Sequence, residues 1–306
     1  MQKRAIVTGA NGFIGSALTN NLAKKNVKVF AIVRNILSNI EMIIEHENIN
    51  IIYCDLDEIQ QIEQIIPDKN IDVFFHLAWA GASGPDRANH EIQMKNISNS
   101  LECAKQSKIL GCSKFIAIGT IGEFMAELAL KNSIVSENFT YALSKNFYHS
   151  LLDIYCYKND INYTWCTLSG VFGKGDKTSN IINYTIQKLL LNETPEFTKA
   201  EQFFDFIYIE DCVDCLIQIG FDNGTDKYFF IGGPRPLPLK EFLKKTRNVV
   251  SPESKLGFGI RKDDGTVYLK EWFTMGKTIQ QLGFSHKYTF EDGIKLTLEW
   301  IKTMNK

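Results

Sequence analysis

Tyr141 and Lys145 are the two residues of this sequence whose types and spacing best support chemistry. They are one helical turn apart, so on a helix their side chains share one face. An ammonium beside a phenol stabilises the phenolate, and we expect Lys145 to lower the Tyr141 pKa from its usual value of about 10. Such a tyrosine exchanges a proton with a carbinol oxygen near neutral pH, and the Thr120 hydroxyl can hold the same oxygen. Thr120, Tyr141 and Lys145 are therefore the predicted catalytic residues, although a Tyr-x-x-x-Lys spacing alone also occurs in surface pairs.

A glycine-rich turn near the N-terminus indicates which molecule accompanies this chemistry. The segment Thr8-Gly9-Ala10-Asn11-Gly12-Phe13-Ile14-Gly15 follows a short apolar run and opens a stretch with helical apolar spacing. Glycines let the backbone turn tightly and approach a pyrophosphate without an intervening Cβ. The following helix directs its free N–H groups and positive dipole end at that pyrophosphate. The segment predicts a bound dinucleotide, the alternative being an ordinary glycine-rich turn.

The elements that must position these residues alternate between strand and helix through the first half of the chain. This rhythm is typical of an α/β fold with a doubly wound parallel sheet, in which ligands bind beyond the carboxyl ends of the strands. After Gly173 the segments become longer, more polar and less regular, which indicates a smaller second lobe. We predict strands at 4–8, 28–33, 49–54, 73–77, 114–119, 162–168, 206–209 and 228–231, and helices at 13–24, through 92–104, at 141–157, near 179–191, from 210 and from 290.

The ends of the second and third predicted strands bear on the choice of dinucleotide. An acid at the end of the second strand usually holds the two free ribose hydroxyls of NAD(H), but this chain has Val33 followed by Arg34. A guanidinium binds a 2′-phosphate through charge-assisted bonds, so Arg34 favours NADP(H), with NAD(H) or a solvated surface arginine as alternatives. Asp55 can accept a hydrogen bond from the adenine amino group, although aspartate is also a common helix N-cap.

The fourth predicted strand ends in His76, followed by Leu77, Ala78 and Trp79. We interpret His76 as a core histidine, because no metal-ligand spacing accompanies it. The small residues that follow would let this loop run beside the cofactor. Cys212 and Cys215 have a Cys-x-x-Cys spacing but lie in an apolar helical pattern, so we predict no metal site.

The composition excludes several other classes of function. The chain has 306 residues and a net charge of −1, so it offers no electrostatic footprint for nucleic acid or an anionic membrane. No apolar run approaches the roughly 20 residues that span a bilayer. The first strand begins almost at once, so we expect no signal peptide. The seven scattered cysteines fit a reduced, cytoplasmic protein.

Together these motifs resemble those of the extended short-chain dehydrogenase/reductases, the superfamily of sugar-nucleotide epimerases, dehydratases and reductases. Later segments agree with this resemblance: Gly170-Val171-Phe172-Gly173-Lys174-Gly175-Asp176, Asp205-Phe206-Ile207-Tyr208-Ile209-Glu210-Asp211 and Leu282-Gly283-Phe284 with Phe290-Glu291-Asp292-Gly293-Ile294. The resemblance implies an NAD(P)-binding Rossmann domain at 1–168 with returning segments from about 206–233, and a mainly sugar-nucleotide-binding lobe at 169–306. It also implies a homodimer through two long helices, near Glu91–Lys105 and Tyr141–Tyr157.

The predicted cofactor-binding residues follow from the motifs and from this resemblance. They are Gly9, Asn11, Gly12, Phe13, Ile14, Gly15, Arg34, Asp55, Leu56, Leu77, Ala78, Trp79, Asn96, Tyr141 and Lys145. The predicted substrate-binding residues are Arg87, Lys188 and Arg261, of which Arg87 and Lys188 can equally be solvated. Phe204 occupies the place of an arginine that is usual in the family, which removes one expected phosphate contact.

Departures from the family pattern narrow the reaction. Ile121 and Gly122 follow Thr120 where 4,6-dehydratases have an Asp-Glu pair, which argues against dehydration. Gly122 also replaces the cysteine of the combined epimerase-reductases. Arg34 favours an NADPH-dependent reductase of a nucleotide-activated 4-keto-6-deoxy sugar, in bacterial surface polysaccharide biosynthesis. The alternatives are an NAD-dependent sugar-nucleotide 4-epimerase and a non-catalytic NADP-binding sensor.

Overall fold

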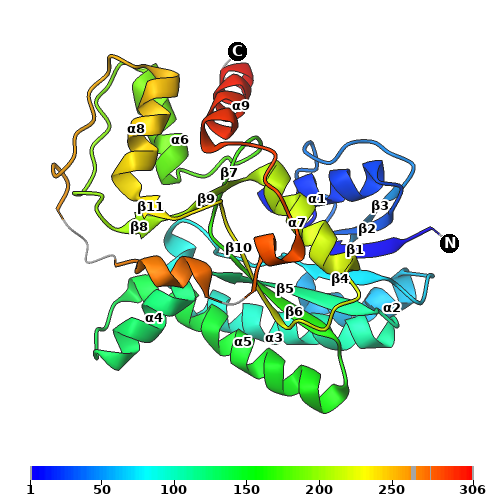
Figure 1. The fold of residues 1–306 in the computed structure, drawn as a ribbon. Helices are drawn as coiled ribbons and strands as arrows, with labels where there is room; N and C mark the ends of the chain where they lie inside the picture. Colours follow the sequence, from blue (N-terminus) through cyan, green and yellow to red (C-terminus); the bar gives the residue numbers. More distant parts are fainter. Residues whose placement is uncertain (1, 263–266, 276, 305–306) are drawn as a thin grey trace. The chain divides into compact units, whose positions relative to one another are not determined.

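The computed structural model of the chain describes residues 2–262, 267–275 and 277–304 (Figure 1). These residues form two compact units. The first comprises the chain up to Thr167 together with Val213–Phe229, and the second comprises Leu168–Cys212 and the chain from Phe230 onward. The first unit thus ends one residue before the predicted boundary, and the segment that returns to it is shorter than the predicted 206–233.

A parallel sheet forms the centre of the first unit, and the predicted doubly wound Rossmann fold is confirmed. The strand order is β10-β6-β5-β4-β1-β2-β3, so β1 lies between β4 and β2, where the direction of the winding reverses. In register, Thr8 at the end of β1 pairs with Ile32 of β2 and His76 of β4. Ligands of such sheets bind beyond the strand ends at this reversal, which is where the glycine turn follows β1.

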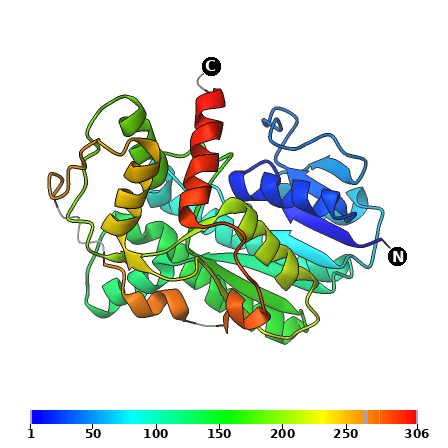
Figure 2. The same ribbon diagram turned by 45° about the horizontal axis from the view of Figure 1, so that its top comes forward.

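Most elements of the first unit coincide with the predicted ones, and Figure 2 shows them from a second direction. The strands are β1 (Arg4–Thr8), β2 (Lys28–Val33), β3 (Ile49–Tyr53), β4 (Val73–His76), β5 (Lys114–Thr120), β6 (Tyr163–Leu168) and β10 (Tyr228–Ile231), which crosses the unit boundary. The α-helices are α1 (Phe13–Lys24), α2 (Ile62–Ile65), α3 (His90–Ile109), α4 (Gly122–Lys131), α5 (Thr140–Asn159) and α7 (Ile209–Phe221), whose first turn belongs to the second unit. The 3₁₀ helices are η1 (Leu56–Gln61), η2 (Pro85–Ala88) and η3 (Glu137–Phe139).

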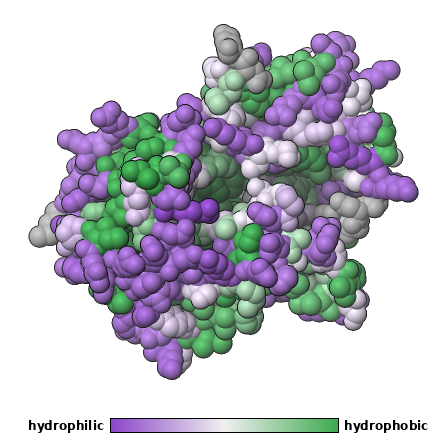
Figure 3. All heavy atoms as spheres, turned by 180° about the vertical axis from the view of Figure 1, so that it is seen from behind, coloured by the Kyte–Doolittle hydropathy of each residue, from purple (hydrophilic) through white to green (hydrophobic). Residues whose placement is uncertain are grey.

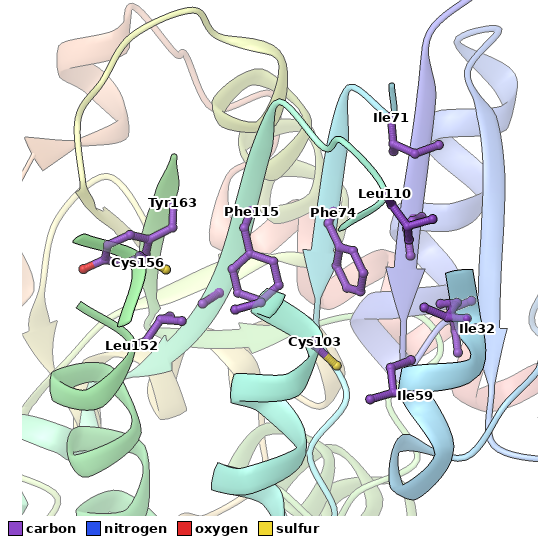
Figure 4. Close-up of a cluster of buried hydrophobic side chains, with 14 of the residues drawn as sticks. Ile32, Ile59, Ile71, Phe74, Cys103, Leu110, Phe115, Leu152, Cys156 and Tyr163 are labelled. Atoms are coloured by element: carbon purple, nitrogen blue, oxygen red, sulfur yellow. The ribbon is translucent and has the colours of Figure 1, made fainter. Parts of the chain in front are cut away.

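One apolar layer fixes the helices α3 and α5 against the sheet. Figure 4 shows Phe74 of β4 and Phe115 of β5 pointing toward Cys103 of α3 and Leu152 of α5. The two phenylalanine rings lie 5.4 Å apart between centroids. Burial of such side chains stabilises the fold by about 1.5–3 kcal/mol each, so this layer holds both helices, and the residues on them, in place.

The second unit is built from short strands and longer helices. Its strands are β7 (Gly170–Phe172), β8 (Phe203–Phe204), β9 (Phe206–Tyr208), β11 (Leu237–Pro238) and β12 (Lys277–Thr278), and its helices are α6 (Ile181–Leu190), α8 (Leu239–Val250), η4 (Lys270–Thr274), η5 (Ile279–Leu282) and α9 (Phe290–Met304). Strand β7 pairs in parallel with β9, β11 pairs antiparallel with β8, and β12 lies beside β10. Phenylalanine rings cluster at its centre: Phe206 lies 5.0 Å from Phe242 and 5.6 Å from Phe290 between centroids.

Two α-helices longer than one turn, α4 and α8, are absent from the prediction. Helix α8 buries Leu239, Phe242, Leu243 and Thr246, a regular 3.6-residue pattern that the sequence does contain. Helix α4 buries the small residues Gly122, Ala126 and Ala129 together with Glu123, so its inward face lacks the large apolar side chains that indicate a buried helix face in a sequence. Its position directly after β5 matters for the site.

The surface is mixed in character. The face in Figure 3 carries many hydrophilic side chains with hydrophobic areas between them. Within the described ranges, no helix has both the length and the apolar character that crossing a bilayer requires.

Candidate functional site

A cleft of about 780 Å³ opens in the first unit beyond the ends of β1, β2 and β4. Every predicted cofactor residue except Tyr141 and Lys145 lines it. These are Gly9, Asn11, Gly12, Phe13, Ile14, Gly15, Arg34, Asp55, Leu56, Leu77, Ala78, Trp79 and Asn96. Residues far apart in the sequence thus share one cavity at the reversal of the strand order.

The glycine turn forms one wall of the cleft, and its geometry fits a dinucleotide. Gly9 has φ +65°, a conformation that favours glycine, and the Gly12 N–H donates to the Gly9 carbonyl at 2.9 Å. A Cβ on Gly15 would lie only 2.0 Å from the Gly9 carbonyl oxygen. Gly12 is the N-cap of α1 and provides no side-chain cap, so the first N–H groups of the helix are free for a phosphate.

Charged residues gather at the far end of the cleft, by β2 and β3. The Arg34 Nε lies 3.9 Å from Asp55 Oδ2, and both side chains are exposed. Nearby, the Lys95 Nζ lies 2.5 Å from Asp57 Oδ2, and Asn99 donates to the same carboxylate at 2.8 Å. The hydrogen bond from Lys95 lowers the Asp57 pKa.

Several lining residues were not among the predicted ones. These are Ile32, Ser38, Cys54, Asp57, Ala80, Ala82, Ile92, Lys95, Asn99 and Ile118. Helical spacing could have identified Asn99, which lies three residues after the predicted Asn96 on α3, and through it Lys95, which lies four residues before Asn99. Ser38 lies in the loop after β2, where the sequence has no comparable signal.

The loop after β4 is held by side chains of α3. The Asn96 side chain accepts from the Ala80 N–H at 2.9 Å and donates to the Ala80 carbonyl at 2.8 Å. His76 bonds Thr8 Oγ1 and Ser100 Oγ, each at 2.8 Å, and burial lowers its pKa to about 3. His76 is therefore a neutral, hydrogen-bonded core residue, as interpreted from the sequence.

Cys212 and Cys215 of α7 are buried, and the described ranges hold no cluster of three or more potential metal ligands.

Tyr141 and Lys145, the predicted catalytic pair, do not line the cleft but contact residues that do. Lys145 is 5% exposed; its Nζ donates to the Ile118 carbonyl at 2.9 Å and lies 3.7 Å from the centre of the Trp79 ring. The Trp79 ring meets the Tyr141 ring edge-on, with centroids 6.3 Å apart. Trp79 and Ile118 both line the cleft, so they connect Lys145 and Tyr141 to it.

The positive charge nearest the Tyr141 ring comes from Arg87 and not from the predicted Lys145. Burial raises the Tyr141 pKa to about 12, and the charge that opposes this rise is the Arg87 guanidinium. Its Cζ lies 4.2 Å from the centre of the Tyr141 ring, while the guanidinium donates to the Ala82 carbonyl at 2.7 Å. Burial also lowers the Lys145 pKa. The prediction that Lys145 lowers the Tyr141 pKa is therefore wrong for this arrangement, because Lys145 faces Trp79 and Arg87 covers the phenol ring.

The other two predicted substrate residues lie together in the second unit, around Tyr184 of α6. Arg261 donates to the Tyr184 hydroxyl at 2.8 Å, and its guanidinium lies 4.8 Å from the ring centre. Lys188, one turn along α6, forms an ion pair with Glu193 that raises its pKa. Phe204 packs against Phe206, with ring centroids 4.8 Å apart.

Comparison with known proteins agrees with this geometry. Residues 5–227 match the family described as the NAD dependent epimerase/dehydratase family. The chain is 27% identical over 320 residues to CDP-abequose synthase of Salmonella muenchen, covering 97% of this chain and 98% of that protein. The solved structure of UDP-glucose 4-epimerase from Thermotoga maritima with UDP-glucose has a TM-score of 0.79 at 20% identity, covering 99% of this chain and 100% of that one. That of the Bordetella bronchiseptica enzyme WbmF with NADH has a TM-score of 0.75 at 18% identity, covering 99% and 93%. The predicted resemblance is thus confirmed, and the chain belongs to the NAD-dependent epimerase/dehydratase family.

Proposed function

We propose that this protein is an NADPH-dependent reductase of a nucleotide-activated 4-keto-6-deoxy sugar. The observation that carries this proposal is the direct contact of Lys145 with Ile118 and Trp79, which connects the acid–base pair to the dinucleotide cleft. The relative from Salmonella muenchen, named for the synthesis of a CDP-linked sugar, supports a sugar-nucleotide product.

The residues of the chain supply the proton and the polar contacts for the reduction. NADPH, when bound, supplies the hydride that reaches C4 of the keto sugar. Tyr141, whose pKa of about 12 keeps it protonated at neutral pH, donates its hydroxyl proton to the ketone oxygen, so that the ketone becomes a secondary alcohol. The Thr120 hydroxyl donates a hydrogen bond to the same oxygen and stabilises its developing negative charge. Lys145 provides a positive charge behind the cleft wall.

Arg34 supports NADP(H) as the cofactor. It lines the cleft at the end of β2, where an acid would select the free hydroxyls of NAD(H). Lys95 is paired with Asp57, whereas Arg34 lies 3.9 Å from Asp55 and is exposed, so the Arg34 guanidinium is the group that supports a bound 2′-phosphate. The family is described as NAD dependent, so the assay below compares NADPH with NADH directly.

The second unit is the proposed sugar-nucleotide-binding lobe. Arg261 is the better placed of its two predicted cations, because its guanidinium is exposed and held by Tyr184, whereas Lys188 already has a carboxylate partner. We further propose a cytoplasmic homodimer that acts in bacterial surface polysaccharide biosynthesis. The exposed apolar residues Met94 of α3 and Phe147 and Ile154 of α5 support pairing through these helices.

The test is an NADPH oxidation assay over a panel of 4-keto-6-deoxy sugars carried on CDP, dTDP, GDP and UDP. We expect NADPH consumption with at least one of them and a smaller rate with NADH. Tight NAD that copurifies, together with interconversion of C4 epimers and no net oxidation, would instead establish the epimerase alternative. Binding of NADP without turnover of any of these sugars would favour the non-catalytic sensor.

Tyr141→Phe is the matched inactive variant for this assay. Loss of the hydroxyl removes the proton donor but keeps the ring under Arg87, so we expect turnover to fall about 10²–10⁴-fold. The affinity for NADPH, measured by fluorescence titration, should stay within about twofold, because the ring that meets Trp79 is retained. Turnover close to that of the unsubstituted enzyme would overturn the catalytic assignment.

A further inference from the structure

A buried carboxylate lies directly behind the proposed catalytic residues. Glu123 belongs to the first turn of α4, three residues after Thr120, and is only 5% exposed. A buried carboxylate is costly unless its oxygens are paired, so its contacts have to account for it.

The first of these contacts fixes the end of β5. The Glu123 Oε1 accepts a hydrogen bond from the Thr120 N–H at 2.6 Å. Its carboxylate also closes over Gly119, where a Cβ would lie 2.7 Å from Oε1. The backbone that carries the Thr120 hydroxyl is thus held on its inner side by Glu123.

A simple helix cap would not explain the burial. The chain makes the same kind of bond at η5, where the Gln281 side chain accepts from the Thr278 N–H at 2.8 Å in an exposed capping box. There a neutral side chain at the surface suffices. At Glu123 the chain uses a carboxylate and buries it, which points to a use for the charge.

The charged and titratable groups that face Glu123 come from three elements. Helix α5 contributes Lys145, Tyr141 and His149, whose Nδ1 lies 3.8 Å from Glu123 Oε2. Glu127 lies one turn along α4, and Tyr228 belongs to β10. Of these, Lys145 is the buried cation: its Nζ donates to the Ile118 carbonyl, two residues before the Thr120 N–H that Glu123 accepts from, so both groups lie at the same end of β5. His149 is stacked on Trp165 with its pKa lowered to about 4, so it is neutral near pH 7.

We propose that Glu123 is a positioning residue of the reductase site, which fixes the Thr120 backbone through its carboxylate and provides the negative charge opposite the buried Lys145 ammonium. Each charge opposes the effect of burial on the other. Burial raises the Glu123 pKa to about 7 and the Lys145 charge lowers it, while burial lowers the Lys145 pKa and the Glu123 charge raises it. Without the Glu123 charge, Lys145 would lose its proton at a lower pH. The inference rests on the proposed function, because Thr120 and Lys145 are catalytic only if the reductase assignment holds.

Two substitutions separate the parts of this role. Glu123→Gln keeps an oxygen for the Thr120 N–H but removes the charge, so we expect the alkaline limb of the kcat/KM profile to move to lower pH by about one unit. Glu123→Ala removes both, and we expect a further loss of kcat of about tenfold with the Kd for NADPH unchanged. Glu127→Gln is the matched control: it lies on the same helix and bonds Asn146 at 2.7 Å, and it should keep the original profile.

A measurement that needs no substrate distinguishes failure of this inference from failure of the reductase assignment. The Lys145 ammonium is titrated by NMR on protein labelled at lysine Cε, with Lys145→Met to assign the signal. We expect a lower Lys145 pKa in Glu123→Gln than in the unsubstituted protein and in Glu127→Gln, whether or not any keto sugar is reduced. An unchanged Lys145 pKa overturns the inference, as does an unshifted pH profile in an active enzyme. If Glu123→Ala does not fold, Glu123→Gln alone decides.

Discussion

The sequence predicts site residues both in the cleft of the first unit and in the Tyr184 cluster of the second, and the structure arranges the two sets differently. In the cleft, thirteen predicted residues lie around one cavity. In the cluster, Lys188 and Arg261 lie near one tyrosine, but each is engaged with a protein group, Glu193 and Tyr184 respectively. A site formed by backbone at strand ends follows from motif spacing, whereas a site formed by long side chains depends on partners that spacing does not specify.

The physical reason is the freedom of the groups involved. Gly9, Gly12 and Gly15 define a backbone path that has few alternatives, because a Cβ would collide with it. Lysine and arginine side chains have many rotamers and take whichever partner is nearest. The predictions below test this contrast, from the largest expected effect to the smallest.

Gly15→Val should abolish dinucleotide binding. Its Cβ alone would lie 2.0 Å from the Gly9 carbonyl oxygen, so the turn would have to open, and we expect NADPH affinity to fall on the order of 100-fold. Gly12→Ala is the graded comparison, since its Cβ would lie 3.2 Å from the same oxygen and should cost less. Equal affinities of the two variants by fluorescence titration would show that backbone geometry does not define the cleft.

Arg34→Ala should change cofactor choice without weakening the fold. The exposed guanidinium is the proposed partner of the 2′-phosphate, so kcat/KM with NADPH should fall about 10–100-fold while the value with NADH changes little. Steady-state kinetics with both cofactors measure this. An equal fall in kcat/KM with NADPH and with NADH would mean that Arg34 does not bind the 2′-phosphate.

Arg87→Ala tests the cation that covers Tyr141. Its removal takes away the positive charge that opposes the rise in the Tyr141 pKa, so that pKa should rise further and the tyrosine become a weaker acid. We expect kcat to fall about tenfold, as the loss of a cation–π contact predicts, with partial recovery in Arg87→Lys. A change confined to KM would instead place Arg87 only in substrate binding.

The sequence predicted the sheet and most of the residues that line the cleft, but not the charges around Tyr141 and Lys145, whose catalytic role stays a prediction. Strands such as Arg4–Thr8 follow from apolar runs between turns, which are local signals. Lys145 contacts Trp79, and Arg87 contacts Tyr141, because the loops after β4 pack against α5. This packing is a tertiary interaction, which local sequence patterns do not predict. The burial of Glu123 was not predicted for the same reason, because it follows from the position of α4, a helix whose buried face carries small residues rather than large apolar ones.

Arg261→Ala and Lys188→Ala should produce the smallest effects and separate the two cations of the second unit. Arg261 donates to a neutral hydroxyl and keeps its charge available, so its loss should raise the KM for the sugar nucleotide about five- to tenfold and leave kcat unchanged. Lys188 is already paired with Glu193 near the surface, so its loss should change KM by less than about twofold. If Lys188→Ala has the larger effect, the ion pair must open to bind substrate. Lys188 would then be a substrate-binding residue, as predicted from the sequence, despite its ion pair with Glu193.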